Sequence, residues 1–110
     1  MTEGKATSAT AQFEIGQIVH HRLFDYRGVI LDVDPDFQGG EDWYQKMARS
    51  HPPKDKPWYH LLVDNSEATT YVAERNLEPS PDLGPIHHSL LAHGLMRYED
   101  GHYVVKRRLV

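Results

Sequence analysis

The sequence predicts an all-β fold, in which about five short antiparallel strands form a small barrel. Short runs rich in β-branched and aromatic residues alternate with turn signals, and no segment has the periodicity of a long helix. The 110 residues are enough for one domain with one small core. An immunoglobulin sandwich needs about 100 residues, whereas the predicted core here has about 60, so a barrel is the better fit.

The first strand is expected within residues 15–22, where β-branched residues follow a small, polar segment. Residues 1–12 contain no large apolar anchor and predict a flexible tail, so the domain is expected to span residues 13–110. Which face of this strand points inward stays open, because the apolar residues Ile18 and Val19 are adjacent.

The second strand, residues 27–34, has an alternation that predicts a half-buried strand with a solvated end. Gly28 indicates a bulge or a close approach of another backbone, and Pro35 ends the strand. The two expected faces are Val29, Leu31 and Val33 on one side, and Ile30, Asp32 and Asp34 on the other.

Residues 36–57 are expected to form a loop and short-helix insertion. Within it, residues 41–50 begin with acids and end near Arg49, which favours a helix because of the helix dipole. Trp43 and Met47 are four residues apart and would form one apolar patch on that helix. So short a helix is marginal alone, so the segment has to dock or be mobile.

The strongest strand signal covers residues 58–64, and residues 68–72 are expected to return as its antiparallel partner. A single helical turn is expected at residues 73–77, with residues 78–81 as its stop. Residues 85–93 fit either a loop or a short helix.

Residues 83–110 form a C-terminal extension that is expected to carry a hairpin. Asp100-Gly101 separates two alternating runs, residues 95–99 and 102–105, and is a strong two-residue hairpin signal. Together these elements predict a small SH3-like barrel with an insertion and an extension attached.

Composition excludes several classes of protein. Without Cys there is no disulfide framework, thiolate zinc site or Cys nucleophile. No apolar run approaches about 18 residues and the start lacks an apolar leader, so a cytoplasmic protein with no membrane contact is expected. The formal net charge is -4: residues 1–80 carry 8 basic and 13 acidic side chains, and residues 81–110 carry 4 and 3. A nucleic-acid partner would therefore have to meet a local basic patch.

The sequence contains no convincing catalytic or metal motif. Its serines lack a nucleophile-elbow context. A hard cation could bind alternating carboxylates at a strand end, but Asp32, Asp34 and Asp36 lack the spacing of a calcium loop. The histidines that could bind zinc lack an HExxH or CxxC context; they are His87, His88, His93 and His102. We therefore expect a protein that is not an enzyme and holds no cofactor or metal.

Two clusters of basic residues are candidates for phosphate contacts. Each Lys or Arg on a phosphate releases counterions, so binding there would be salt-sensitive. The chain's Tyr and Trp residues could stack on bases, although a barrel also needs aromatic filling. The clusters are His20, His21, Arg22 and Arg27, and Lys106, Arg107 and Arg108.

Four stretches occur in an ordered combination that is more specific than any one of them. They are Phe13-x-Ile15-Gly16-Gln17-x-Val19-x-His21, Tyr26-x-Gly28-Val29-Ile30-x-x-Val33-Asp34-Pro35, Pro57-Trp58-Tyr59-His60-x-Leu62-Val63 and Thr70-Tyr71-Val72-Ala73-Glu74-x-Asn76-Leu77. Over residues 13–79 this combination resembles the YccV-like, or HspQ, heat-shock domain family, described as hemimethylated-DNA-binding. Gly101-His102-Tyr103 resembles longer variants of the same domain.

The resemblance implies an SH3-like barrel, DNA as a ligand, and a link to the stress response and regulated proteolysis. It supplies no catalytic residue. His60 is polar within an otherwise apolar strand, so it is expected either to pair across the sheet or to face a groove.

The resulting hypothesis is a non-enzymatic module that binds duplex DNA through a basic patch, with hemimethylated DNA as the ligand that the resemblance implies. The patch is expected to contain Arg22, Arg27, Arg75, Lys106, Arg107 and Arg108, with His20, His21 and His60 as further donors. The alternative is an adaptor or specificity factor for an ATP-dependent protease, or a substrate of one, with protein contacts through Trp43 and Met47. Self-association is also open, because exposed sheet edges pair readily.

Overall fold

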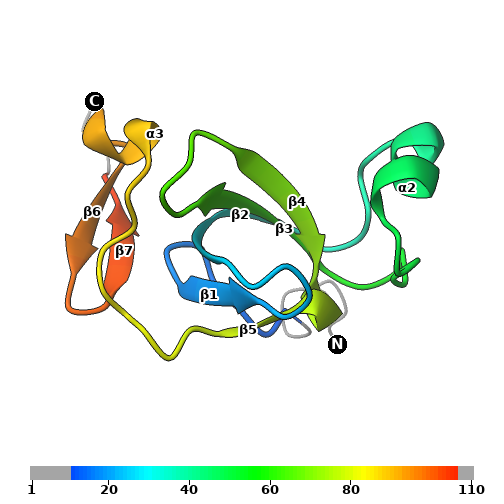
Figure 1. Cartoon of the computed structure of the whole chain (residues 1–110), viewed down its shortest axis with the longest axis horizontal. Helices are drawn as coiled ribbons and strands as arrows, with labels where there is room; N and C mark the ends of the chain where they lie inside the picture. The colour runs from blue at the N-terminus through cyan, green and yellow to red at the C-terminus, as the bar shows by residue number, and fades with distance from the viewer. Residues whose placement is uncertain (1–10, 107–110) are drawn as a thin grey trace, which may run out of the picture.

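The computed structural model describes residues 11–106 and is an all-β structure built on one five-stranded antiparallel sheet (Figure 1). The strand order is β4-β3-β2-β1-β5, and β6 pairs with β7 in a separate two-stranded sheet. The strands are β1 (Ile18–His21), β2 (Arg27–Asp34), β3 (Trp58–Val63), β4 (Thr69–Ala73), β5 (Leu77–Pro79), β6 (Met96–Glu99) and β7 (His102–Val105). The short helices are α2 (Glu41–Met47), η1 (Glu74–Asn76) and α3 (Ser89–Ala92). The predicted all-β class is confirmed.

The sheet is strongly curved, because the chain passes from one of its edges to the other within a few residues. Only η1 separates Ala73, the last residue of β4, from Leu77, the first residue of β5. Four residue steps span at most about 14 Å, whereas the edges of a flat five-stranded sheet would lie about 19 Å apart. The sheet therefore has to curl. Within residues 11–106, β4 and β5 remain its two edges, so strand pairing does not close the predicted barrel.

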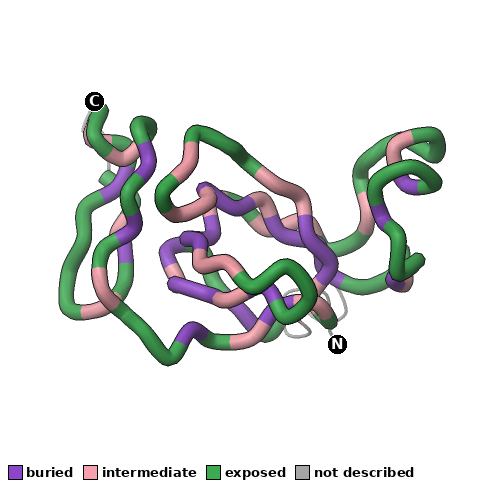
Figure 2. Tube along the Cα trace, viewed as in Figure 1, coloured by how far each residue is buried: buried purple, intermediate pink, exposed green. Residues whose placement is uncertain are grey.

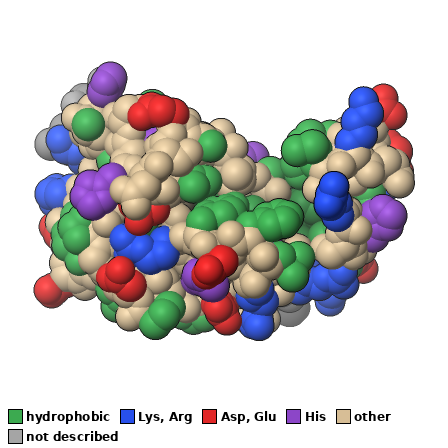
Figure 3. All heavy atoms as spheres, in the orientation of Figure 1, with side chains coloured by type: hydrophobic (Ala, Val, Ile, Leu, Met, Phe, Trp, Pro, Cys, Tyr) green, Lys and Arg blue, Asp and Glu red, His purple; other side chains and the backbone are tan. Residues whose placement is uncertain are grey.

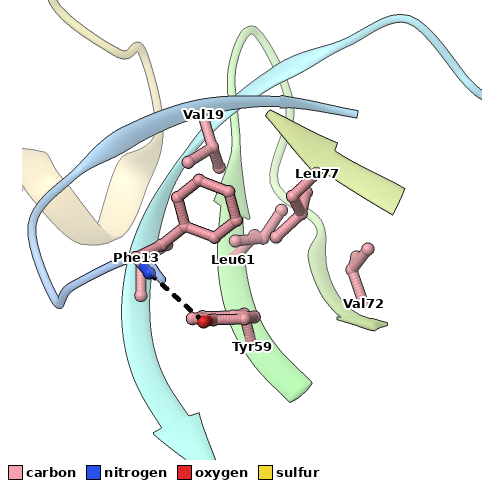
Figure 4. Packing of buried hydrophobic residues seen from close by; sticks show 7 residues of the cluster. Phe13, Val19, Tyr59, Leu61, Val72 and Leu77 are labelled. Carbon is pink, nitrogen blue, oxygen red and sulfur yellow. Dashed lines mark hydrogen bonds between the residues drawn. The ribbon is translucent and has the colours of Figure 1, made fainter. Parts of the chain in front are cut away.

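The concave side of the sheet holds the inner core (Figure 4). The Phe13 backbone N–H donates a hydrogen bond to the Tyr59 hydroxyl at 3.3 Å, and the two rings meet edge to face with centroids 5.6 Å apart. This contact fixes the chain at the predicted start of the domain. The buried members of the inner core are Phe13, Val19, Ile30, Tyr59, Leu61, Val72 and Leu77.

The outer side of the sheet is also buried, because each appended segment covers part of it (Figure 2). The C-terminal extension packs Ile86, Met96 and Tyr103 against Ile18 of β1. The insertion covers another part with side chains from α2 and the loops beside it. This resolves the open question about β1: Ile18 belongs to the outer cluster and Val19 to the inner core.

A bulge in β2 makes the predicted faces of this strand wrong beyond Leu31. The register with β3 shifts between Ile30 and Asp32, so the alternation restarts one residue later. Val33 therefore lies on the inner side of the sheet, as Ile30 does. It was predicted to share a face with Leu31, which lies on the outer side. Asp32 and Asp34 move to the outer face of the sheet.

At Gly28 the backbone of β3 comes close to β2, which is one of the two predicted reasons for a glycine here. The bulge, the other predicted reason, lies between Ile30 and Asp32. A Cβ added at Gly28 would lie 2.8 Å from the Leu62 carbonyl oxygen on the neighbouring strand. A larger residue would not fit between β2 and β3, so this position requires glycine.

The insertion contains α2 inside the predicted range, and this helix is docked. Tyr44 is buried and its hydroxyl donates to the Pro52 carbonyl at 2.6 Å. Tyr44 and Ala48 pack with Trp58 of β3 in one cluster. A helix of seven residues is too short to be stable alone. These tertiary contacts therefore stabilise α2 more than its own helix propensity does.

The segment after η1 differs from its prediction. Residues 78–81 were expected to be a stop, but Leu77–Pro79 pairs with β1 as an edge strand. Pro79 is tolerated because an edge strand leaves one row of N–H groups unpaired. Further along, α3 confirms the short-helix alternative for residues 85–93, with His88 as its N-cap.

The Asp100-Gly101 hairpin is confirmed. Both residues have positive φ angles, 51° and 86°, as a type I′ turn requires. The hairpin shares no strand pairing with the main sheet; it packs Met96 and Tyr103 against the sheet, and the Tyr103 N–H donates to the carbonyl of Gly16, just before β1, at 2.8 Å. Of the predicted tail, residues 1–10 lie outside the described residues. None of the helices described within residues 11–106 is long and apolar enough to cross a membrane.

Candidate functional site

A groove of about 350 Å³ lies between the insertion, β4 and the turn that joins β1 to β2. Figure 3 shows the surface hollowed beside the projecting insertion, with hydrophobic side chains gathered around the hollow. Within the described part of the chain no Asp or Glu side chain lines this groove, although the whole protein carries a net charge of -4. The groove lining is therefore mainly apolar and contains no described acidic side chain.

Aromatic rings form the wall of the groove on the side of the insertion. Trp43 of α2 meets Trp58 of β3 edge to face at 6.2 Å, and Trp58 lies 5.2 Å from Tyr71 of β4. Phe37 packs against all three rings. Both tryptophans of the chain thus line the groove, so tryptophan fluorescence reports on it directly.

Large apolar side chains are exposed on both sides of the groove. Met47 of α2 is 61% exposed on one side, and Leu23 and Phe24 of the β1–β2 turn are 57% and 64% exposed on the other. Exposed apolar groups that gather around a concavity are typical of binding sites. Trp43 and Met47 were predicted as an apolar patch, and both line this groove. Leu23 and Phe24 were missed.

His21 explains why the β1–β2 turn presents Phe24 to solvent. Its Nδ1 accepts hydrogen bonds from the Leu23 and Phe24 backbone N–H groups, both at 3.1 Å. Its ring stacks on Phe24 with centroids 4.7 Å apart. Burial lowers the pKa of His21, and the neighbouring His20 adds to this. A buried, neutral His21 shapes the turn, and its Nδ1 has no proton to donate to phosphate.

His20 has both ring nitrogens occupied by carboxylates. Nε2 lies 2.6 Å from Asp25 and Nδ1 lies 2.7 Å from Glu78. The hydrogen bonds to these two carboxylates raise the pKa of His20 above its ordinary value of 6.5. Both nitrogens are thus committed to the link between the β1–β2 turn and β5.

Replacing His20 with glutamine should remove a pH-dependent part of the free energy of unfolding. The folded-state pKa is raised, so the stabilisation is fully present below the unfolded pKa of about 6.5 and is lost as pH rises through the folded value. Urea denaturation should show a larger difference between wild type and H20Q at about pH 5.5 than at about pH 8.5. A difference that grows with pH would contradict this ion-pair arrangement.

Arg27 holds the C-terminal extension against the sheet. Its side chain is 16% exposed, and the guanidinium bonds the Asp64 carboxylate at 2.9 Å. Burial by itself would raise the pKa of Asp64, but the His87 backbone N–H and Arg27 outweigh it and lower that pKa. The other acceptors of Arg27 are the carbonyls of Asp82, Gly84 and Pro85, at 2.8, 2.8 and 3.0 Å. Four of the five guanidinium N–H groups are therefore used inside the fold.

The remaining predicted cations do not form one patch. Arg22 and Arg75 lie near each other, because the Arg22 N–H bonds the Asn76 carbonyl at 2.8 Å. Arg75 bonds the Ser50 carbonyl at 2.6 Å, and its neighbour Arg49, which was not predicted, lines the groove. Lys106 is exposed beyond β7 on the separate hairpin sheet. Arg107 and Arg108 lie outside the described residues.

His60 satisfies both of the alternatives considered for it. It pairs across the sheet with Asp32 of β2 and Tyr71 of β4, and it lines the groove. Its Nε2 lies 3.1 Å from Asp34, whose carboxylate also accepts a 2.6 Å hydrogen bond from the Tyr71 hydroxyl. Burial and this hydrogen bond raise the pKa of Tyr71, so the hydroxyl stays protonated and donates. The β2 bulge is what places Asp34 beside His60.

Asp32, Asp34 and His60 are the group of potential metal ligands that residues 11–106 bring together, with donor atoms within 4.8 Å of one another. Asp34 and His60 already bond each other, and Asp32 accepts from the Val33 N–H at 2.9 Å. These contacts already give each of the three side chains a partner within the protein. The absence of a metal remains a prediction.

Comparison with protein families identifies the chain. The model described as "Hemimethylated DNA-binding protein YccV like" matches residues 11–102. That range contains the whole five-stranded sheet, the insertion with its groove, and most of the hairpin. The chain therefore belongs to the YccV-like hemimethylated DNA-binding protein family.

Proposed function

We propose that this protein is a non-enzymatic DNA-binding module that distinguishes hemimethylated from other duplex DNA. Its membership of the YccV-like family carries the proposal. Exposed cations near the groove support it: Arg49 lines the groove, and Arg22 and Arg75 are exposed close to Asn76 and Ser50 at the same end, with Arg22 3.8 Å from the Glu78 carboxylate. They would meet phosphates, which fix position without reading sequence.

The apolar rim offers a means of sensing a methyl group. A methyl group on a base in the major groove is read by apolar contact. Phe24 and Met47 are exposed apolar side chains within the same site as Arg49. Because the net charge is -4, affinity should be modest and sensitive to salt.

Titrating one duplex in its hemimethylated, fully methylated and unmethylated forms at two salt concentrations tests the proposal. We expect the tightest binding to the hemimethylated form, and a salt slope that decreases by about 1 for each phosphate-contacting arginine removed in R22Q and R75Q. Arg97 is the matched control, because it is exposed on the separate hairpin and paired with Glu99. Equal, weak binding to all three forms would remove the methylation claim, and no binding at low salt would remove DNA as ligand.

A protein partner is the second candidate, and the exposed apolar rim favours it. Leu23, Phe24 and Met47 suit a protein surface as well as a methyl group. In this role the protein would act in the stress response as an adaptor or specificity factor for an ATP-dependent protease, or as its substrate. Affinity capture from nuclease-treated, heat-shocked lysate tests it: protease subunits should co-purify with wild type and be lost with F24S. Capture of wild type without any protease subunit would exclude the adaptor role.

A further inference from the structure

The outer edge of β4 presents backbone groups that no described strand pairs. β4 is the last strand on its side of the sheet. The Ala68 carbonyl accepts a hydrogen bond from the Val63 N–H at 3.1 Å. At the other end of β4, the Glu74 N–H donates to the Pro57 carbonyl, just before β3, also at 3.1 Å. Because antiparallel residues alternate between bonded and non-bonded positions, Thr69 and Tyr71 turn their N–H and C=O groups away from β3.

This edge runs along the groove, since all five residues of β4 line it. Val72 and Ala73 are buried, so the accessible part of the edge is the stretch from Thr69, which is exposed, to Tyr71, which is half-buried. Within residues 11–106 no hydrogen bond satisfies the outward backbone groups of Thr69 and Tyr71. An unpaired strand edge beside apolar side chains is a template for another strand.

The charges around the groove select the occupant further. Arg49 lines it, and Arg22 and Arg75 lie close to the same end, near Asn76 and Ser50. No described acidic side chain lines the groove to balance Arg49. Charge complementarity therefore favours a carboxylate at that end.

We propose that the groove binds an extended peptide segment of a partner protein, which pairs with β4 as an added strand. Its backbone would exchange hydrogen bonds with Thr69 and Tyr71, and its apolar side chains would lie between Phe24 and Met47. An acidic side chain of the segment would meet Arg49. This inference goes beyond DNA binding and holds whether or not the protein binds DNA.

Tryptophan fluorescence measures the interaction, because Trp43 and Trp58 line the groove. The probe is the capped peptide acetyl-Thr-Val-Thr-Val-Thr-Asp-amide, which is extended, apolar on one face and acidic at one end. The matched control has the same sequence with N-methyl groups on every backbone nitrogen, so that it keeps its side chains but has no N–H on either edge to donate to a neighbouring strand. We expect binding to weaken at least tenfold with the control, in line with two lost hydrogen bonds of about 1 kcal/mol each.

Three variants test the three contacts separately. T69P removes an outward N–H at a position where an edge strand tolerates proline, R49E should reverse the preference between the probe and its Lys-terminated analogue, and M47S removes the apolar contact. L95S is the control, because Leu95 is also an exposed apolar residue, at 41%, and belongs to the C-terminal extension, outside the groove lining. Amide chemical-shift changes should centre on Thr69 and Tyr71.

The outcomes separate this proposal from DNA binding. No fluorescence change with the peptide up to about 1 mM, where binding free energy is only about 4 kcal/mol, would overturn it. So would equal affinity for the N-methylated control. A single-stranded thymidine decamer that quenches the tryptophans while the peptide does not would assign the groove to base stacking instead. The duplex titrations are read independently of these results.

Discussion

Replacing Arg27 with methionine should lower the free energy of unfolding by about 3–5 kcal/mol, the range for breaking a buried ion pair from one side. Methionine keeps the aliphatic stem but removes every guanidinium hydrogen bond. Asp64, which is only 11% exposed, would then lose its partner. Three carbonyls of residues 82–85 would lose their donor as well. Urea denaturation followed by circular dichroism measures the loss.

A double-mutant cycle with D64N isolates the ion pair. The double variant R27M/D64N should recover part of the lost stability, because the asparagine no longer leaves a buried charge unpaired. If R27M unfolds like wild type but binds DNA more weakly, with a salt slope lower by about 1, Arg27 contacts a DNA phosphate and its bonds to residues 82–85 and Asp64 contribute little to stability. The stability and the DNA affinity of R27M together therefore distinguish an Arg27 that contacts DNA, as the sequence predicted, from one that holds the C-terminal extension against the sheet.

Local signals in the sequence were sufficient where the structure itself is local. Asp100-Gly101 forms the hairpin because the turn geometry depends on those two residues alone. The acids and the spacing of Trp43 and Met47 likewise predicted α2 within its range. The four family stretches predicted the family and the strands of the sheet, since the stretches follow one another along the chain as these strands do.

Contacts between distant residues were not predictable in this way. Arg27 resembles a surface cation in sequence, but its acceptors lie 37 to 58 residues further along the chain. The β2 bulge depends on the register with β3, and it alone decides that Asp34 meets His60. Phe24 lines the groove because His21 bonds its backbone N–H and stacks on its ring, and neither contact has a signal in the local sequence. The candidate site was therefore half predictable: the patch on α2 was evident, and the wall opposite it was not.

Replacing Trp58 with alanine should have a comparable effect on stability and a distinct effect on the groove. Trp58 is 1% exposed, its indole N–H donates to the Pro53 carbonyl at 3.1 Å, and its ring lies 4.8 Å from Phe37. Removing a buried aromatic side chain of this size costs about 3–5 kcal/mol. Here the loss should fall on the docking of the insertion, because Trp58 is the sheet residue against which Tyr44 packs.

Trp43 provides the matched control for this prediction, since it belongs to the same aromatic wall but is only half-buried. W43A should lower the free energy of unfolding by roughly 1 kcal/mol, because the half-buried side chain of Trp43 buries less apolar area in the folded protein than that of Trp58 does. In W58A, fluorescence from the remaining Trp43 should shift to the red before the main urea transition, as the insertion detaches from a sheet that is still folded. Coincident transitions by fluorescence and circular dichroism would mean that the insertion and the sheet unfold as one unit. In that case the groove is a rigid part of the fold, and a ligand would have to fit the shape it already has.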